Sequence, residues 1–134
     1  MASVYTEHLG KTAANYVPLT PLHFIERAAQ VYPNHPAMIH LGVTRTWSQH
    51  YARCRQLASA LARKNIGRED TVSIIAHNCP AHMEVYFGVP MVGAVISALN
   101  TRLDATMIAF MLEHSETKLL FVDRQLSGVV KIAL

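Results

Sequence analysis

The chain has 134 residues, of which 51% are hydrophobic and only 16% are charged, against about 25% charged in an average globular protein. Its net charge is +3, and its basic residues cluster between Arg45 and Arg68 without a nucleic-acid-binding module, which argues for a solvated helix face and against a nucleic-acid partner. Two cysteines cannot form a disulfide framework, and the first residues lack the apolar segment of a secretory signal. We therefore expect a protein of a reducing compartment and place it in the cytoplasm.

The first third of the chain predicts an arm, a helix and a ribbon. Residues 1–17 are polar and irregular, which favours a flexible N-terminal arm. Thr20 is typical of a residue that caps a helix, and Pro33 ends that helix. Residues 36–48 predict two short strands that turn at Gly42.

Ser48 is expected to cap the clearest helix of the chain. Apolar residues recur there every three or four positions, from Tyr51 to Leu61, and Arg53 is expected to face water on the opposite side. Asn65 and Gly67 end the pattern.

The rest of the chain alternates between strands and helices. Runs of apolar residues at 71–76, 94–99 and 118–123 predict strands that are buried on both faces. One helix is expected over 80–94, with Asn78 as its cap and Pro90 bending its last turn, and a second follows Asp104. A last helical pattern begins near Arg124. This order predicts an α/β fold, a partial parallel βαβαβ sheet.

Residues 85–99 carry no charge, which raises the question of a membrane span. A spanning helix needs about 20 apolar residues. Fifteen are too few, and Gly88, Pro90 and Gly93 interrupt them. We expect a buried helix without a transmembrane segment, in which Gly88 and Gly93 allow close packing on the sheet.

The residues alone point to no chemical site. The six glycines are isolated, so a dinucleotide or phosphate loop is excluded. His77, Cys79 and His82 are metal-ligand types, but no further ligand pair follows at a defined spacing, which favours an ordinary strand-to-helix loop. The other histidines have no evident nucleophile partner. We assign no catalytic, no cofactor-binding and no metal-ligating residue.

The predicted sheet is incomplete. Three parallel strands expose both sheet edges and apolar faces, which isolated domains normally avoid. The last residues also lie inside a helical pattern. We therefore expect 18–134 to be an incomplete segment of a larger domain.

Particular segments of the sequence resemble those of a known family. "TWSQHYARC" and "GVPMVGAVISALNTRL", separated by a stretch that contains "GREDTVSIIAHN", are similar to the N-terminal part of AMP-forming acyl-CoA synthetases, with the fatty-acyl and medium-chain branch most alike. The resemblance covers about residues 16–134. It implies the N-terminal portion of the large domain of the adenylate-forming, AMP-binding superfamily.

The resemblance also implies an activity for a longer parent enzyme. Such an enzyme activates a fatty or other carboxylic acid with ATP and Mg²⁺ to an acyl-adenylate and passes the acyl group to coenzyme A. The family's phosphate loop, acidic metal motif, ribose-binding Asp and catalytic Lys have no counterpart here, so this segment is expected to bind none of these ligands by itself. The remainder of the enzyme chain is its expected partner. The alternative is a naturally short, non-catalytic binding or partner module of the same fold.

Overall fold

The computed structural model describes residue 7 and residues 10–134. The expected arm of residues 1–17 therefore lies partly outside the described residues. The elements, in chain order, are α1 (Pro21–Val31), β1 (Pro36–His40), β2 (Val43–Thr46), α2 (Trp47–Arg63), β3 (Thr71–Ile75), α3 (Pro80–Gly88), the 3₁₀ turn η1 (Pro90–Val92), β4 (Val95–Ala98), α4 (Ala105–His114), β5 (Thr117–Val122), the 3₁₀ turn η2 (Arg124–Leu126) and α5 (Ser127–Ala133).

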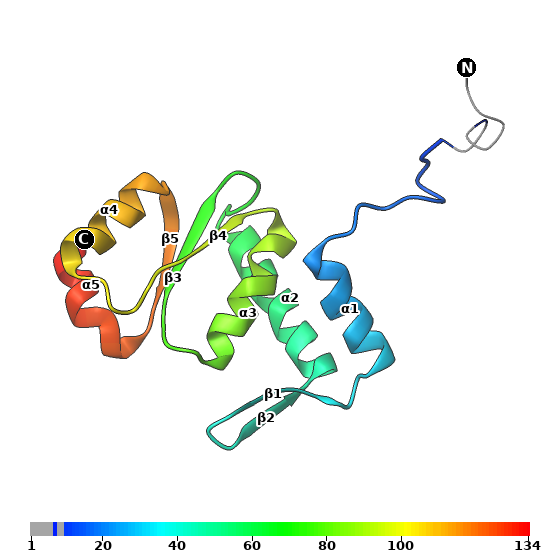
Figure 1. Ribbon diagram of the computed structural model, residues 1–134, viewed down its shortest axis with the longest axis horizontal. Coiled ribbons are helices and arrows are strands. Elements are labelled where there is room, and N and C mark those ends of the chain that lie inside the picture. Colours follow the sequence, from blue (N-terminus) through cyan, green and yellow to red (C-terminus); the bar gives the residue numbers. More distant parts are fainter. Residues whose placement is uncertain (1–6, 8–9) are drawn as a thin grey trace.

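A three-stranded parallel sheet forms the centre of the molecule. Its strand order is β4-β3-β5, so the chain leaves β3 toward one neighbour and later crosses to the other. Helices α2 and α3 lie on one side of the sheet, and α4 and α5 lie on the other (Figure 1). The predicted α/β fold with a partial parallel βαβαβ sheet is confirmed.

The central strand β3 divides its side chains between two cores. Val72 and Ile74 pack with residues of α2 and α3, whereas Ile75 packs with residues of α4 and α5. Full burial of such a side chain contributes roughly 1.5–3 kcal/mol. The hydroxyl of Ser73 is buried as well and lies 2.6 Å from that of Thr117 on β5, so its polar group is satisfied. This double burial explains why the strand is apolar on both faces apart from Ser73.

The antiparallel ribbon β1–β2 projects from one end of the molecule (Figure 1). Leu41 and Gly42 connect the strands with φ values of 45° and 80°. Positive φ at both central residues is typical of a type I′ turn, whose twist matches that of the strands. The predicted pair of strands around Gly42 is confirmed.

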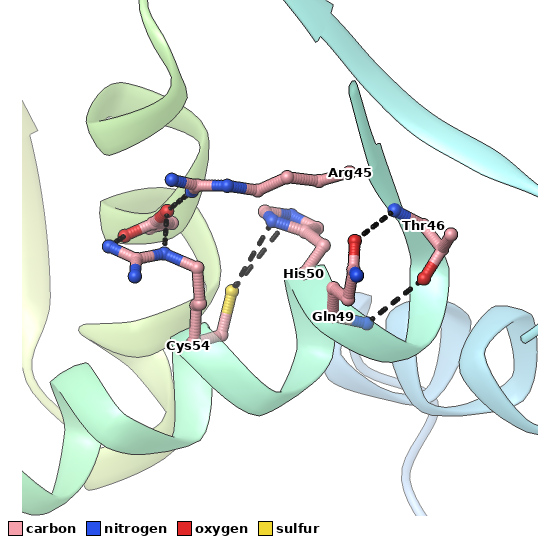
Figure 2. Close-up of polar contacts among 7 residues, drawn as sticks. Arg45, Thr46, Gln49, His50 and Cys54 are labelled. Atoms are coloured by element: carbon pink, nitrogen blue, oxygen red, sulfur yellow. Dashed lines mark hydrogen bonds and ion pairs between the residues drawn. The ribbon is translucent and has the colours of Figure 1, made fainter. Parts of the chain in front are cut away.

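Helix α2 begins at Trp47, and its N-cap lies two residues before the predicted one. Thr46 is the N-cap: its side chain accepts a hydrogen bond from the Gln49 backbone at 3.3 Å, and the Gln49 side chain accepts one from the Thr46 backbone at 3.0 Å (Figure 2). This reciprocal pair is a capping box. Ser48 lies inside the first turn, so the expectation that it caps the helix is wrong. The predicted caps Thr20 and Asp104 are confirmed.

The helix expected over 80–94 is shorter than predicted. It ends at Gly88, and Pro90–Val92 form a separate 3₁₀ turn. Proline has no backbone N–H to donate to the preceding turn, so the α-helical ladder stops before it. Gly88 contacts Leu57 and Cys54 of α2 rather than the sheet, and Gly93 takes a left-handed φ of 80° after the 3₁₀ turn.

Within the described residues, none of the helices combines the length and the apolar character that crossing a bilayer requires. The apolar stretch of residues 85–99 is instead divided between α3, η1 and β4.

Candidate functional site

The carboxyl edge of the parallel sheet contains a hollow. In open α/β sheets, ligands bind outside the carboxyl ends of the strands, where the order of connections reverses. The hollow at this edge has a volume of about 390 Å³. It is lined by Ala76, His77, Asn78, His82, Tyr86, Ala98, Leu99, Asn100 and Thr101.

Two polar side chains at this edge are engaged in local turns. Asn100 accepts a hydrogen bond from the backbone of Arg102 at 2.9 Å. Asp123, which follows β5, accepts one from the backbone of Gln125 at 3.0 Å and caps η2. Both side chains therefore stabilise the backbone after a strand.

The loop after β3 holds His77 and Cys79, and the first turn of α3 holds His82, the three residues of metal-ligand type in this region. The described part of the chain contains no group of three His, Cys, Asp or Glu side chains placed to hold a metal ion. Cys79, not Asn78, occupies the N-cap position of α3, and its carbonyl accepts the His82 backbone N–H at 3.1 Å. The expected cap at Asn78 is wrong by one residue.

His82 is in an unusual position on the first turn of α3. Its ring stacks on Tyr86, with centroids 5.1 Å apart and planes 15° from parallel. Both ring nitrogens are buried, and neither has a hydrogen-bond partner among the described residues. A neutral imidazole carries one N–H donor and one acceptor, and leaving such a group unpaired costs about 1–3 kcal/mol. His82 is therefore the least satisfied polar side chain of this region.

A second hollow lies between β1 and α3, with a volume of about 200 Å³. It shares Asn78, His82 and Tyr86 with the hollow at the carboxyl edge. We call it the ribbon groove. It is lined by Met38, Ile39, His40, Asn78, Cys79, Pro80, His82, Met83 and Tyr86.

Glu84 of α3 joins three elements through ion pairs. Arg53 of α2 donates from Nε to Oε1 at 2.5 Å and from Nη2 to Oε2 at 3.0 Å, and Arg45 of β2 donates from Nη1 to Oε1 (Figure 2). The Glu84 side chain is only 9% exposed. A carboxylate buried to this extent costs several kcal/mol unless it is paired. The network therefore fixes the ribbon and α3 against α2.

The basic residues of this region are mostly exposed, as the prediction of a solvated face expects: Arg55, Arg63, Lys64 and Arg68 all face solvent. Arg53 is half-exposed and Arg45 less so, and these two are paired with Glu84. The hydrogen bond with Glu84 raises the pKa of Arg53 above its usual value. Glu84 is the single acidic residue between Asp70 and Asp104. A lone carboxylate in an apolar helix is the sequence signal that could have indicated the ion pairs of Glu84.

His50 and Cys54 lie beside the network and are both buried. The Cys54 Sγ is 3.9 Å from each ring nitrogen of His50 (Figure 2). Burial, assisted by the nearby Glu84 carboxylate, raises the pKa of the Cys54 thiol to about 12. A thiol with such a pKa stays protonated and is a poor nucleophile near neutral pH. The pair is a packed core contact rather than a catalytic dyad.

Comparison with known proteins gives the family context for this geometry. The family of AMP-binding enzymes matches residues 25–133. The chain is 53% identical over 117 residues to the peroxisomal trans-cinnamate:CoA ligase of Petunia hybrida, covering 87% of this chain and 20% of that protein. It is 50% identical over 119 residues to the peroxisomal acetate/butyrate–CoA ligase AAE7 of Arabidopsis thaliana, covering 89% and 21%. The chain thus spans about a fifth of the length of these curated relatives.

Solved structures agree with the sequence relatives. A fatty acyl CoA synthetase of Mycobacterium tuberculosis is similar with a TM-score of 0.79 and 25% identity, over 82% of this chain and 22% of that one. The O-succinylbenzoate coenzyme A synthetase of Bacillus subtilis, in complex with ATP and magnesium, is similar with a TM-score of 0.72 and 25% identity, over 76% and 28%. These likenesses confirm the fold expected from the resemblance.

The expected cytoplasmic location is contradicted by these relatives. Five of the curated proteins that resemble this chain are peroxisomal. The prediction rests on cysteine count and on the lack of a secretory signal, and these features separate reducing from oxidising compartments only. Peroxisomal import depends on short targeting signals that a receptor recognises, and amino-acid composition does not reveal such signals.

Proposed function

Because this chain belongs to the AMP-binding enzyme family, we propose that it forms the N-terminal part of an ATP-dependent acyl-CoA synthetase. In the proposed reaction a carboxylate oxygen attacks the α-phosphorus of ATP, and pyrophosphate leaves. The thiol of coenzyme A then attacks the carbonyl carbon of the acyl-adenylate, loses its proton, and AMP leaves. The observation that carries the proposal is the identity of about half of all residues with CoA ligases over nearly nine-tenths of the chain.

The proposed substrate is a carboxylic acid of a class wider than fatty acids. The relatives are named for cinnamate, for acetate and butyrate, and for benzoate. These acids share a carboxylate and differ in size and aromatic character. Five of the relatives are peroxisomal, so we place the proposed synthetase in that organelle.

The proposed role of residues 18–134 is that of a scaffold for the catalytic groups. Transfer of the adenylyl group needs donors and a metal ion around the triphosphate. Here the glycines are isolated in sequence, and the loop after β3 carries none. We therefore place the residues that bind ATP, Mg²⁺ and coenzyme A in the part of the synthetase that this chain does not cover. We assign no catalytic residue to this chain.

A second candidate is a non-catalytic partner module of the same fold. The observation that favours it is the sheet itself: within the described residues, β4 and β5 each pair with β3 alone, so both outer edges are open. An open edge can accept a strand from another polypeptide. The mass of the native gene product distinguishes the two candidates. This chain covers 20–21% of the curated relatives, so a gene product as long as those relatives would support the scaffold role.

An ATP–pyrophosphate exchange assay tests the scaffold role. We expect the purified 134-residue chain to give no exchange with MgATP and cinnamate, butyrate or benzoate, since the triphosphate-binding groups lie elsewhere. The Petunia hybrida cinnamate ligase, assayed in parallel, provides the positive control. Exchange by the short chain at a rate comparable to that of the control would mean that it contains a complete adenylation site and would overturn the proposal.

A further inference from the structure

The β1–β2 ribbon is anchored at its base, where the backbone N–H of Trp47 donates to the carbonyl of His35 at 3.1 Å. Farther out its packing is loose. Ile39 and Leu41 are well exposed, and the ribbon groove, with a volume of about 200 Å³, lies between β1 and α3. A two-stranded ribbon has at best marginal stability by itself. Contacts beyond the base therefore decide whether the ribbon stays closed on the helices.

Among the described residues, a single ion pair connects the ribbon to α3. The Arg45 guanidinium of β2 donates to the Glu84 carboxylate, and Figure 2 shows the extended Arg45 side chain that makes this contact. Arg45 donates one hydrogen bond through Nη1, whereas Arg53 of α2 donates two to the same carboxylate. A disturbance of this shared site should therefore release Arg45 before Arg53.

His50 belongs to the same cluster and is almost fully buried on α2, which packs against both ribbon strands. Burial lowers the pKa of His50, the Glu84 carboxylate raises it in part, and the Arg45 guanidinium lowers it further. The titratable groups of the cluster are Arg45 from β2, Glu84 from α3, and Arg53 and Cys54 from the helix of His50, while His40 of β1 lines the ribbon groove. Two guanidinium groups already share one carboxylate, so a proton on His50 would add a third cation to a site with one anion, which is unfavourable.

We propose that the ribbon is an acid-released flap: a proton on His50 displaces Arg45 from Glu84, and β1 and β2 then move away from α3 about their anchored base. This movement lets water reach the imidazolium and separates two of the three cations. Helices α2 and α3 stay joined, because Arg53 keeps both of its hydrogen bonds to Glu84. The flap involves residues of this chain alone and does not depend on the proposed synthetase activity.

Amide hydrogen exchange of the 134-residue chain, followed by NMR at several pH values, tests the flap. Opening returns the pKa of His50 toward 6.5 and so takes up one proton. After correction for intrinsic exchange rates, the protection of the ribbon amides should fall about tenfold for each unit by which the pH drops below 6.5, until the folded pKa is reached. Low urea should not change this exchange, since a local opening exposes little surface, whereas the β3 amides should be better protected and sensitive to urea. Ribbon exchange that ignores pH, or that shares the urea dependence of β3, would overturn the proposal.

Variants assign the acid response to His50 and the closure to Arg45. His50→Gln removes the proton acceptor and should make ribbon protection independent of pH, whereas Arg45→Gln should leave the ribbon poorly protected at neutral pH as well. His40→Gln is the matched control, because His40 is the titratable residue of the ribbon that lines the groove, and this variant should keep the full acid response. An acid response that persists in His50→Gln would also overturn the proposal. If a variant fails to fold, the pH and urea series on the unmodified chain decides the question.

Discussion

At the scale of single residues, His50 is the group whose ionisation opposes folding. It is 1% exposed, and its ring packs edge-on against Trp47 and Phe87. Burial lowers the pKa of His50 below its ordinary value of 6.5; the nearby Glu84 carboxylate raises it in part, and the Arg45 guanidinium lowers it. In the folded protein the imidazole therefore stays neutral at a pH where the unfolded chain already binds a proton.

This difference predicts that acid destabilises the protein. Since the folded pKa is depressed, the contribution of neutral His50 is fully present above pH 6.5 and is lost as the pH falls from 6.5 toward the folded pKa. Urea unfolding on either side of pH 6.5 measures the slope. His50→Gln should flatten it, and the control His35→Gln, at an exposed position, should not. An unchanged slope in His50→Gln would contradict the prediction.

At the scale of elements, the contact between α2 and α3 depends on Gly88. A Cβ at this position would lie 2.8 Å from the Leu57 Cδ2 and 3.0 Å from the Cys54 carbonyl oxygen. The Leu57 side chain can shift, but the carbonyl belongs to the backbone of α2. Overpacking of this kind costs about 1–3 kcal/mol and exceeds the gain in helix propensity, which is at most about 1 kcal/mol at a helix end.

We therefore expect Gly88→Ala to lower the free energy of unfolding by about 1 kcal/mol. Gly128→Ala is the matched control, because Gly128 lies in α5 and an added Cβ there would meet no atom within 4 Å beyond its chain neighbours and the nearby backbone of its own helix; it should be neutral or slightly stabilising. Urea denaturation measures the free energy of unfolding of both variants, provided that their m-values equal that of the parent. A Gly88→Ala variant as stable as the parent would mean that α3 can move away from α2 without loss.

The elements themselves are largely predictable because their signals are local. The three strands appear as apolar runs, and Thr20 and Asp104 precede their helices as caps. The start of α2 is harder to place, because Ser48 competes as a cap with the Thr46–Gln49 capping box, whose two partners stand three residues apart. A sequence pattern often fits two starting points, and the backbone hydrogen bonds decide between them.

The candidate site is not predictable, because its contacts are distant in sequence. Arg45 and Arg53 lie 39 and 31 residues before Glu84, and neither spacing identifies the pair in a sequence pattern. The ribbon groove likewise exists only because β1 packs near α3. The sequence marks His82 as a metal-ligand type, but its missing hydrogen-bond partners among the described residues are a property of packing.

At the scale of the whole molecule, apolar side chains remain on several surfaces. Val95 of the outer strand β4 is 56% exposed, Ile132 of α5 is 78% exposed, and Leu41 of the ribbon turn is 90% exposed. Large contiguous apolar surfaces of monomeric proteins mark sites of association. The open outer strands add unpaired backbone groups to these surfaces in the part of the chain that the structure describes.

These surfaces predict that the isolated chain binds a hydrophobic dye or self-associates. Sedimentation velocity measures self-association, and dye fluorescence measures dye binding, each at several protein concentrations. The double variant Ile39→Thr, Ile132→Gln should self-associate less and bind less dye, because each substitution removes a well-exposed apolar side chain. Retained near-ultraviolet circular dichroism separates a folded chain from a molten one, which also binds dye. A compact monomer that binds no dye would mean that the open sheet needs no further polypeptide, and would favour the partner module over the scaffold of a larger synthetase.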